Sequence, residues 1–77
     1  MEQTIMELIR ELLKMDTKKL EAHLDDNQVW DSLTWLEAVF SIEEELQIKF
    51  EESEFPQIKT PRELCTAAVK KASSNEL

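Results

Sequence analysis

Ser32 is the residue of this sequence whose type and position best suit chemistry. It follows a polar loop with Asp25, Asp26 and Asn27 and opens a strongly helical segment. The first turn of a helix has unpaired backbone N–H groups and the positive end of the helix dipole, so a phosphate on or beside this hydroxyl would be stabilised. Asp31 and Ser32 are also among the commonest helix caps, and for an arbitrary Asp-Ser pair capping alone is the more frequent explanation.

The other reactive side chains show no pattern typical of an enzyme or a metal site. One cysteine (Cys65) and one histidine (His23) allow neither an intrachain disulfide nor a cysteine-cluster or two-histidine metal site. The chain has no glycine, which excludes a glycine-rich phosphate loop. Cys65 is predicted to be a buried structural thiol and His23 a solvated loop residue. We therefore predict no catalytic activity and no bound metal.

Length and charge narrow the class of protein. The 77 residues suffice for one small domain, and 9 basic against 17 acidic residues give a net charge of −8. Such a charge repels nucleic acid and anionic lipid and attracts basic protein surfaces. No apolar run reaches the length of a membrane span, about 18 residues or more, and the acidic, amphipathic first residues do not predict a secretion signal. We expect a cytoplasmic monomer that binds neither nucleic acid nor membrane.

Hydrophobic spacing predicts an all-α fold, a four-helix bundle with three long helices and one short one in a single domain over 1–77. The long helices are expected at about 4–15, 32–47 and 61–72, the short one at 52–57, and a frayed tail at 73–77. Thr4 and Glu7 fit a capping box for the first helix, and Thr60 and Glu63 fit one for the last, with Pro61 at its first position. Residues 18–23 could add a short turn of helix.

The helix expected at 32–47 has two apolar stripes, although packing in a small bundle needs only one. The first stripe comprises Trp35, Ala38, Val39, Ile42 and Leu46. The second comprises Leu33, Leu36 and Phe40, and the acids on or near it are Glu37, Glu43, Glu44 and Glu51. Either a wide core face or a docking surface of apolar anchors ringed by acids would explain the second stripe.

This helix and the residues before it resemble the acyl carrier proteins. Asp31-Ser32-Leu33 is followed by Leu36-Glu37 and by the run Ile42-Glu43-Glu44-Glu45-Leu46-Gln47-Ile48. The similarity covers about 24–69 and includes the Thr60-Pro61 helix start. The Asp31-Ser32-Leu33 triplet alone has little specificity for the family. The triplet, the helix pattern and the Thr60-Pro61 helix start together are fairly specific.

The resemblance implies a function for Ser32. A phosphopantetheinyl transferase would attach 4′-phosphopantetheine from coenzyme A to Ser32, and the arm would carry an acyl or aminoacyl group as a thioester. Asp31 would help to position the transferase's metal and the arm's phosphate, and Leu33 completes the attachment motif. Loading and accepting enzymes would contact Leu33, Leu36, Glu37, Phe40, Glu43 and Glu44. The inner faces that can shelter the cargo would include Ala38, Ile42, Leu46, Ile58 and Ala67.

Two positions depart from the family's pattern. Val29 stands where many carriers have glycine, and Trp30 stands where fatty-acid carriers commonly have a small residue. The motif is closer to free-standing carriers of specialised pathways, with polyketide, nonribosomal-peptide, fatty-acid-like and polysaccharide-modifying pathways all open. Trp35 is expected near the mouth of a cargo cleft, where its bulk would favour short or polar cargo. Alternatively, the tryptophans simply pack in the core.

A second hypothesis needs no cofactor. An unmodified acidic helical module could bind a basic partner through the same surface at Leu36 and Phe40. Ser32 distinguishes the two hypotheses, because a carrier needs its hydroxyl whereas an interaction module would use it at most as a cap.

Overall fold

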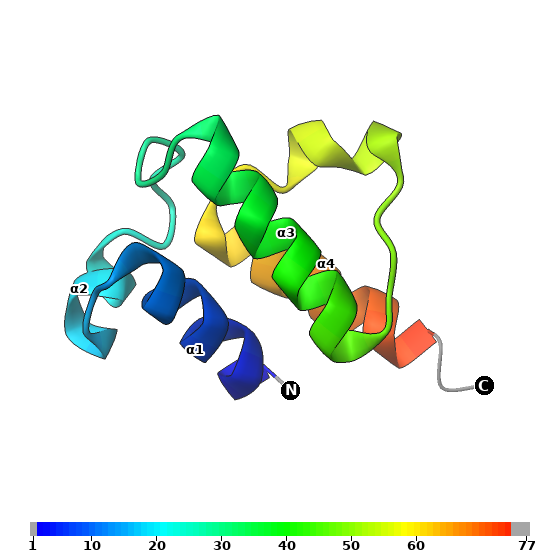
Figure 1. Cartoon of the computed structure of the whole chain (residues 1–77), viewed down its shortest axis with the longest axis horizontal. Coiled ribbons are helices and arrows are strands. Elements are labelled where there is room, and N and C mark those ends of the chain that lie inside the picture. The colour runs from blue at the N-terminus through cyan, green and yellow to red at the C-terminus, as the bar shows by residue number, and fades with distance from the viewer. Residues whose placement is uncertain (1, 75–77) are drawn as a thin grey trace.

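A computed structural model describes residues 2–74, which are helical with connecting turns and loops (Figure 1). The elements in chain order are α1 (Glu2–Leu13), α2 (Thr17–Ala22), α3 (Ser32–Leu46), the 3₁₀ helix η1 (Glu52–Gln57) and α4 (Pro61–Ser74). The predicted all-α class is confirmed, with α1, α3 and α4 as its three long helices. Besides the expected short helix η1, the short helix α2 forms where the sequence allowed a helical turn.

The starts of α3 and α4 follow from their caps. The Asp31 carboxylate accepts a hydrogen bond from the Thr34 backbone N–H at 2.8 Å. At α4, the Glu63 N–H donates to Thr60 Oγ1 at 3.1 Å, and the Thr60 N–H donates to Glu63 Oε1 at 3.2 Å. These two reciprocal bonds form the predicted capping box, which satisfies two N–H groups that the helix leaves unpaired.

The start of α1 differs from the prediction. The helix already includes Glu2, so Thr4 and Glu7 lie inside it and the capping box expected there was wrong. Polar residues at 2 and 3 are compatible with a helix, so nothing in the sequence delays its start to Thr4.

The ends of α1 and α3 share one geometry. Lys14 and Gln47 follow the two helices with left-handed backbone, at φ values of 55° and 56°. The next residue in each case, Met15 or Ile48, donates its N–H back to a carbonyl of the last helical turn. Glycine usually takes this position, and this chain has none. α1 therefore ends at Leu13, short of the predicted residue 15.

The last helix is longer than expected, because α4 continues past residue 72 to Ser74. Residues 75–77 of the expected tail lie outside the described residues.

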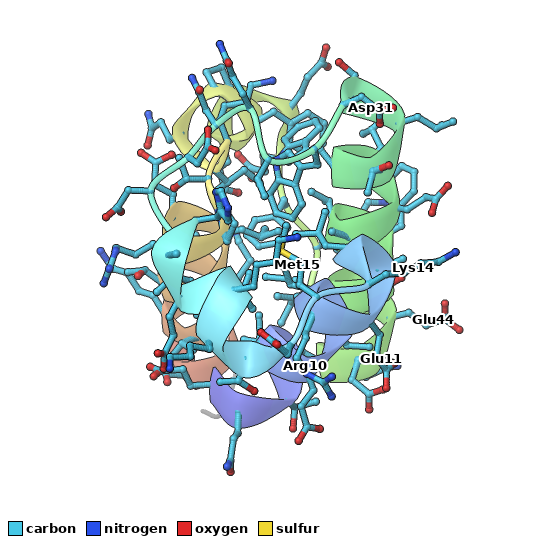
Figure 2. All side chains as sticks on the ribbon, turned by 90° about the vertical axis from the view of Figure 1, so that its left-hand side faces the viewer. Arg10, Glu11, Lys14, Met15, Asp31 and Glu44 are labelled. Atoms are coloured by element: carbon cyan, nitrogen blue, oxygen red, sulfur yellow. The ribbon has the colours of Figure 1, made fainter. Side chains whose placement is uncertain are left out.

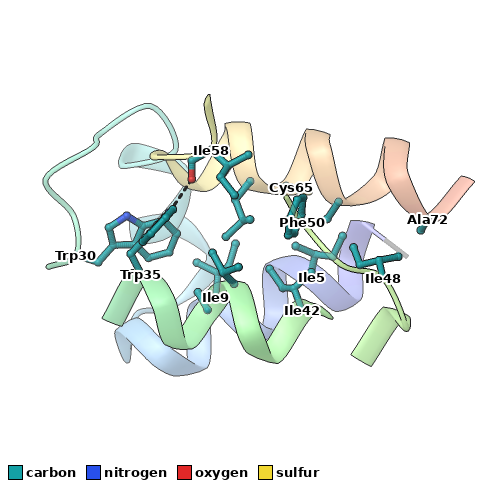
Figure 3. Packing of buried hydrophobic residues seen from close by; sticks show 14 of the residues in the cluster. Ile5, Ile9, Trp30, Trp35, Ile42, Ile48, Phe50, Ile58, Cys65 and Ala72 are labelled. Carbon is teal, nitrogen blue, oxygen red and sulfur yellow. Dashed lines mark hydrogen bonds between the residues drawn. The ribbon is translucent and has the colours of Figure 1, made fainter. Parts of the chain in front are cut away.

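The core lies where α1, α3 and α4 pack against one another (Figure 3). The first apolar stripe of α3 faces it, with four of its members buried and Leu46 partly buried. Among residues 2–73 no charged or polar side chain is buried. Fully enclosed side chains from all three helices fill this space: Ile5, Ile9, Val39, Ile42 and Leu64. The core is therefore apolar throughout the described chain.

Cys65 and His23 occupy ordinary structural positions. Cys65 is buried, as predicted, and burial is the main cause that raises the pKa of its thiol. His23 ends α2 and lies half-buried, with Nδ1 3.2 Å from the Asp26 carboxylate. Within residues 2–74, no cluster of histidine, cysteine and acidic residues could hold a metal ion, and none of the helices could cross a membrane.

Candidate functional site

Ser32 is the first residue of α3, and its side chain is exposed. Asp31 precedes it with extended backbone and acts as the N-cap. Since the aspartate supplies the cap, the serine hydroxyl is not needed to start the helix. The Ser32 hydroxyl forms no hydrogen bond with any other residue in the described range. The structure thus presents an exposed hydroxyl at the positive end of a helix of 15 residues.

The electrostatics of Asp31 follow from its cap. The hydrogen bond from the Thr34 backbone N–H, assisted by the Thr34 side chain, lowers the pKa of the Asp31 carboxyl group below its usual value. Asp31 is therefore fully ionised at neutral pH. The cap thus places a fixed negative charge beside Ser32.

Acidification is expected to destabilise the wild type more than an Asp31→Asn variant. The pKa of the Asp31 carboxyl group is lower in the folded state than in the unfolded chain. Its contribution to the free energy of unfolding is therefore complete at a pH above its pKa in the unfolded chain. It is lost as the pH falls through the folded-state value. Asparagine also caps helices but does not titrate. Urea denaturation of both proteins at neutral pH and at about pH 3 measures the difference, and equal losses of stability would contradict this role.

A hollow of about 110 Å³ adjoins Ser32. Its lining comes from the loop before α3, from α3 itself and from the segment between η1 and α4, and consists of Asn27, Trp30, Asp31, Ser32, Trp35 and Lys59. Residues far apart in the sequence therefore meet at the serine.

Two tryptophans, here named the tryptophan pair (Trp30 and Trp35), fasten these segments together. Trp35 Nε1 donates to the Ile58 carbonyl at 2.7 Å (Figure 3), and Trp30 Nε1 donates to the Lys59 carbonyl at 2.9 Å. Trp35 also packs edge-on against Phe55, with ring centroids 5.4 Å apart. Both indoles are buried, at 9% and 6% exposed, so packing in the core applies to both.

Lys59 also lines the hollow, and its side chain lies over the ring of Trp35. Its ammonium lies 4.2 Å from the centroid of the Trp35 ring, within the range of a cation–π contact. Lys59 could not be predicted as a site residue, because its place beside Ser32 depends on contacts between segments far apart in the chain. Trp30 and Trp35 were the only residues near Ser32 in the sequence that pointed to packing around the serine.

The second stripe of α3 is only partly a surface. Leu33 and Phe40 are 68% and 56% exposed and are the exposed large hydrophobic side chains of the described residues. Leu36 instead packs partly against the core. The stripe therefore has two exposed anchors, and its middle member helps to hold α3 in place.

The acids near this stripe also differ from one another. Glu37 and Glu44 are exposed. Glu43, expected to face partners, accepts a hydrogen bond from the Phe50 backbone N–H at 2.7 Å and is half-buried. Its carboxylate fixes the chain that follows α3. Figure 2 shows Asp31 at one end of α3 and Glu44 toward the other, both on the outside of the ribbon, so exposed acids accompany the helix along its length.

A larger groove of about 650 Å³ lies between η1 and α4, away from Ser32. Two of its lining cations have carboxylate partners: Lys71 pairs with Glu54 and Arg62 pairs with Asp25, both at 2.8 Å. The bond from Lys71 is the main cause that lowers the pKa of Glu54. These pairs fasten η1 and the first loop to α4.

Comparison with known families decides what kind of protein this is. The family model described as a phosphopantetheine attachment site matches residues 3–68. The chain belongs to this family. Searches of curated proteins and of solved structures each found no match.

Members of the family carry covalently attached 4′-phosphopantetheine, and they are carriers rather than enzymes. They interact with phosphopantetheinyl transferases and with biosynthetic enzymes. The predicted family, cofactor and lack of catalysis are therefore confirmed. The residues around Ser32 fit a phosphodiester, since the exposed hydroxyl, the N-terminus of α3 and the ammonium of Lys59, from the segment before α4, all suit it.

Proposed function

We propose that this chain carries an acyl or aminoacyl group as a thioester on a 4′-phosphopantetheine arm attached to Ser32. The observation that supports this most is the exposed Ser32 hydroxyl, which is freed from capping by Asp31 at the start of α3. The arm supplies the thiol that forms the thioester. The chain itself supplies the attachment oxygen, an ionised Asp31 for the transferase's metal ion, and a surface for partner enzymes.

Thioester loading tests this function. After incubation with acetyl-coenzyme A, Mg²⁺ and a broad-specificity transferase, the wild type and a Ser53→Ala control should gain one acetyl-phosphopantetheine by mass. Ser53 is an exposed serine of η1, far from Ser32 in the chain. Neutral hydroxylamine should then remove only the acetyl group. A label that resists hydroxylamine, or labelling of Ser32→Ala, would contradict the proposal.

The partner surface comprises Leu33 and Phe40 with Glu37 and Glu44, and we name it the docking strip. Its two exposed anchors would enter apolar pockets, and its carboxylates would attract a basic rim. The proposed partners are the transferase and the enzymes that load or accept the acyl group. Glu43 and Leu36, predicted for the same role, contribute more to the fold than to this surface.

Substitutions in the docking strip should weaken recognition without unfolding the protein. We expect Phe40→Ala and Glu37→Gln each to lower kcat/KM for the transferase, Phe40→Ala by about tenfold or more. Because both side chains are exposed, the free energy of unfolding should change by no more than about 0.5 kcal/mol. Glu21→Gln, an equal charge change on α2, serves as the control. Equal kinetics for all these variants would contradict the docking strip.

The packing of the tryptophan pair supports a proposal about the size and polarity of the cargo. Trp35 fills the space between α3 and the segment before α4, where it is held by Phe55 and by the Ile58 carbonyl. Ala38, Ile42 and Ile58 are enclosed, and Leu46 and Ala67 are partly buried against the same core. This packing supports short or polar cargo. The pathway, the cytoplasmic location and the monomeric state stay predictions.

A further inference from the structure

Lys59 and Ser32 line the same small hollow although they lie in different segments. The hollow, at about 110 Å³, is well below the roughly 300–1,000 Å³ of sites for whole small molecules. It therefore has room for a small group at the base of an arm and not for the arm or its cargo. The group attached directly to Ser32 in a carrier of this family is a phosphodiester, which is an anion.

Lys59 differs from the paired cations of α4. Arg62 and Lys71 each have a carboxylate partner at 2.8 Å. Lys59 forms no ion pair with any acid in the range 2–74, although the chain has a net charge of −8. Its ammonium instead lies over the face of Trp35. An aromatic face attracts the ammonium but leaves its N–H donors able to meet an anion.

The position of Lys59 is fixed by the tryptophan pair. Trp30 binds the carbonyl of Lys59 itself, and Trp35 binds the carbonyl of Ile58 just before it. Both indoles belong to the segment that contains Ser32. The lysine backbone is thus held against the start of α3, and a contact that forms in the hollow needs little further ordering of the chain.

We propose that Lys59 pairs with the phosphodiester formed on Ser32 and holds the base of the arm against the tryptophan pair. This inference rests on the proposed function, because it needs the arm on Ser32. It assigns Lys59 a binding role and the tryptophan pair a positioning role. Because both indoles line the hollow, attachment of the arm should also change their fluorescence.

Phosphorus NMR of the arm-bearing protein tests the contact directly. The ³¹P resonance of the phosphodiester should move in Lys59→Met, should return most of the way in Lys59→Arg, and should stay in place in Lys18→Met. Lys18 is an exposed lysine of α2 and removes the same charge elsewhere. Lysine ¹⁵Nζ spectra of the wild type should show a shift at Lys59, larger than at Lys18, when the arm is attached. Lys59→Gln, measured by the same ³¹P shift, provides a second variant should Lys59→Met fold poorly.

The outcomes separate this inference from the function on which it rests. Intact mass is measured first, and an absence of phosphopantetheine on Ser32 would overturn both. If the mass gain is complete but the ³¹P shift is the same in the wild type, Lys59→Met and Lys18→Met, only the role of Lys59 is overturned. A shift in Lys59→Met that Lys59→Arg does not reverse would also overturn it, because arginine keeps the charge that the proposal requires.

Discussion

The Ser32→Ala variant is expected to accept no phosphopantetheine while keeping the wild-type free energy of unfolding to within about 0.5 kcal/mol. The variant loses the only oxygen proposed to form the phosphodiester. Its stability is unaffected because Asp31, and not Ser32, caps α3, and because the serine side chain is exposed. Intact mass after transferase treatment and urea denaturation measure the two quantities.

This variant also distinguishes the carrier from an unmodified interaction module. A module that binds a basic partner through Leu36 and Phe40 would keep its function in Ser32→Ala, because neither that surface nor the fold depends on the hydroxyl. Family membership favours the carrier. Full biological activity of Ser32→Ala in the native host would contradict the carrier function.

Trp35→Ala is expected to cost about 3–5 kcal/mol of stability, the range for removing a large aromatic side chain from a core. The total free energy of unfolding of small domains is roughly 5–15 kcal/mol, so a substantial fraction of the variant molecules is expected to be unfolded. The indole is 6% exposed and contacts Phe55, Lys59 and the Ile58 carbonyl, and all of these contacts would be lost together. Urea denaturation followed by circular dichroism measures the loss.

Trp35→Phe provides the milder comparison. Phenylalanine keeps most of the aromatic packing but has no N–H, so the Ile58 carbonyl loses its indole partner at a cost of about 1–3 kcal/mol. We expect its midpoint to lie between those of the wild type and Trp35→Ala. A loss of less than about 1 kcal/mol in Trp35→Ala would show that the tryptophan does not hold α3 to the segment before α4.

Local signals predicted those parts of the fold that depend on neighbouring residues. The capping box at Thr60 and Glu63 and the buried stripe of α3 both appear as expected, because caps and helical periodicity are properties of short segments. The left-handed residues Lys14 and Gln47 were not predicted. Their helices end without the glycine that usually marks such a turn, so the sequence had no signal for them.

Tertiary contacts account for what could not be predicted at the site. Glu43 belongs to a run of acids that resembles a solvated or partner-facing surface, yet it binds the Phe50 N–H once the chain reverses after Gln47. The bonds from Trp30 and Trp35 reach carbonyls 29 and 23 residues away. A backbone carbonyl as acceptor carries no sequence signature, so the place of Lys59 beside Ser32 could be known only from the folded chain.

Tandem mass spectrometry of the wild type, after incubation with coenzyme A, Mg²⁺ and a phosphopantetheinyl transferase, tests the central claim most directly. The account predicts a mass gain of one phosphopantetheine per chain, with fragments that locate the group on Ser32. Attachment to another residue, or no gain with several transferases under conditions that modify a known carrier, would contradict it.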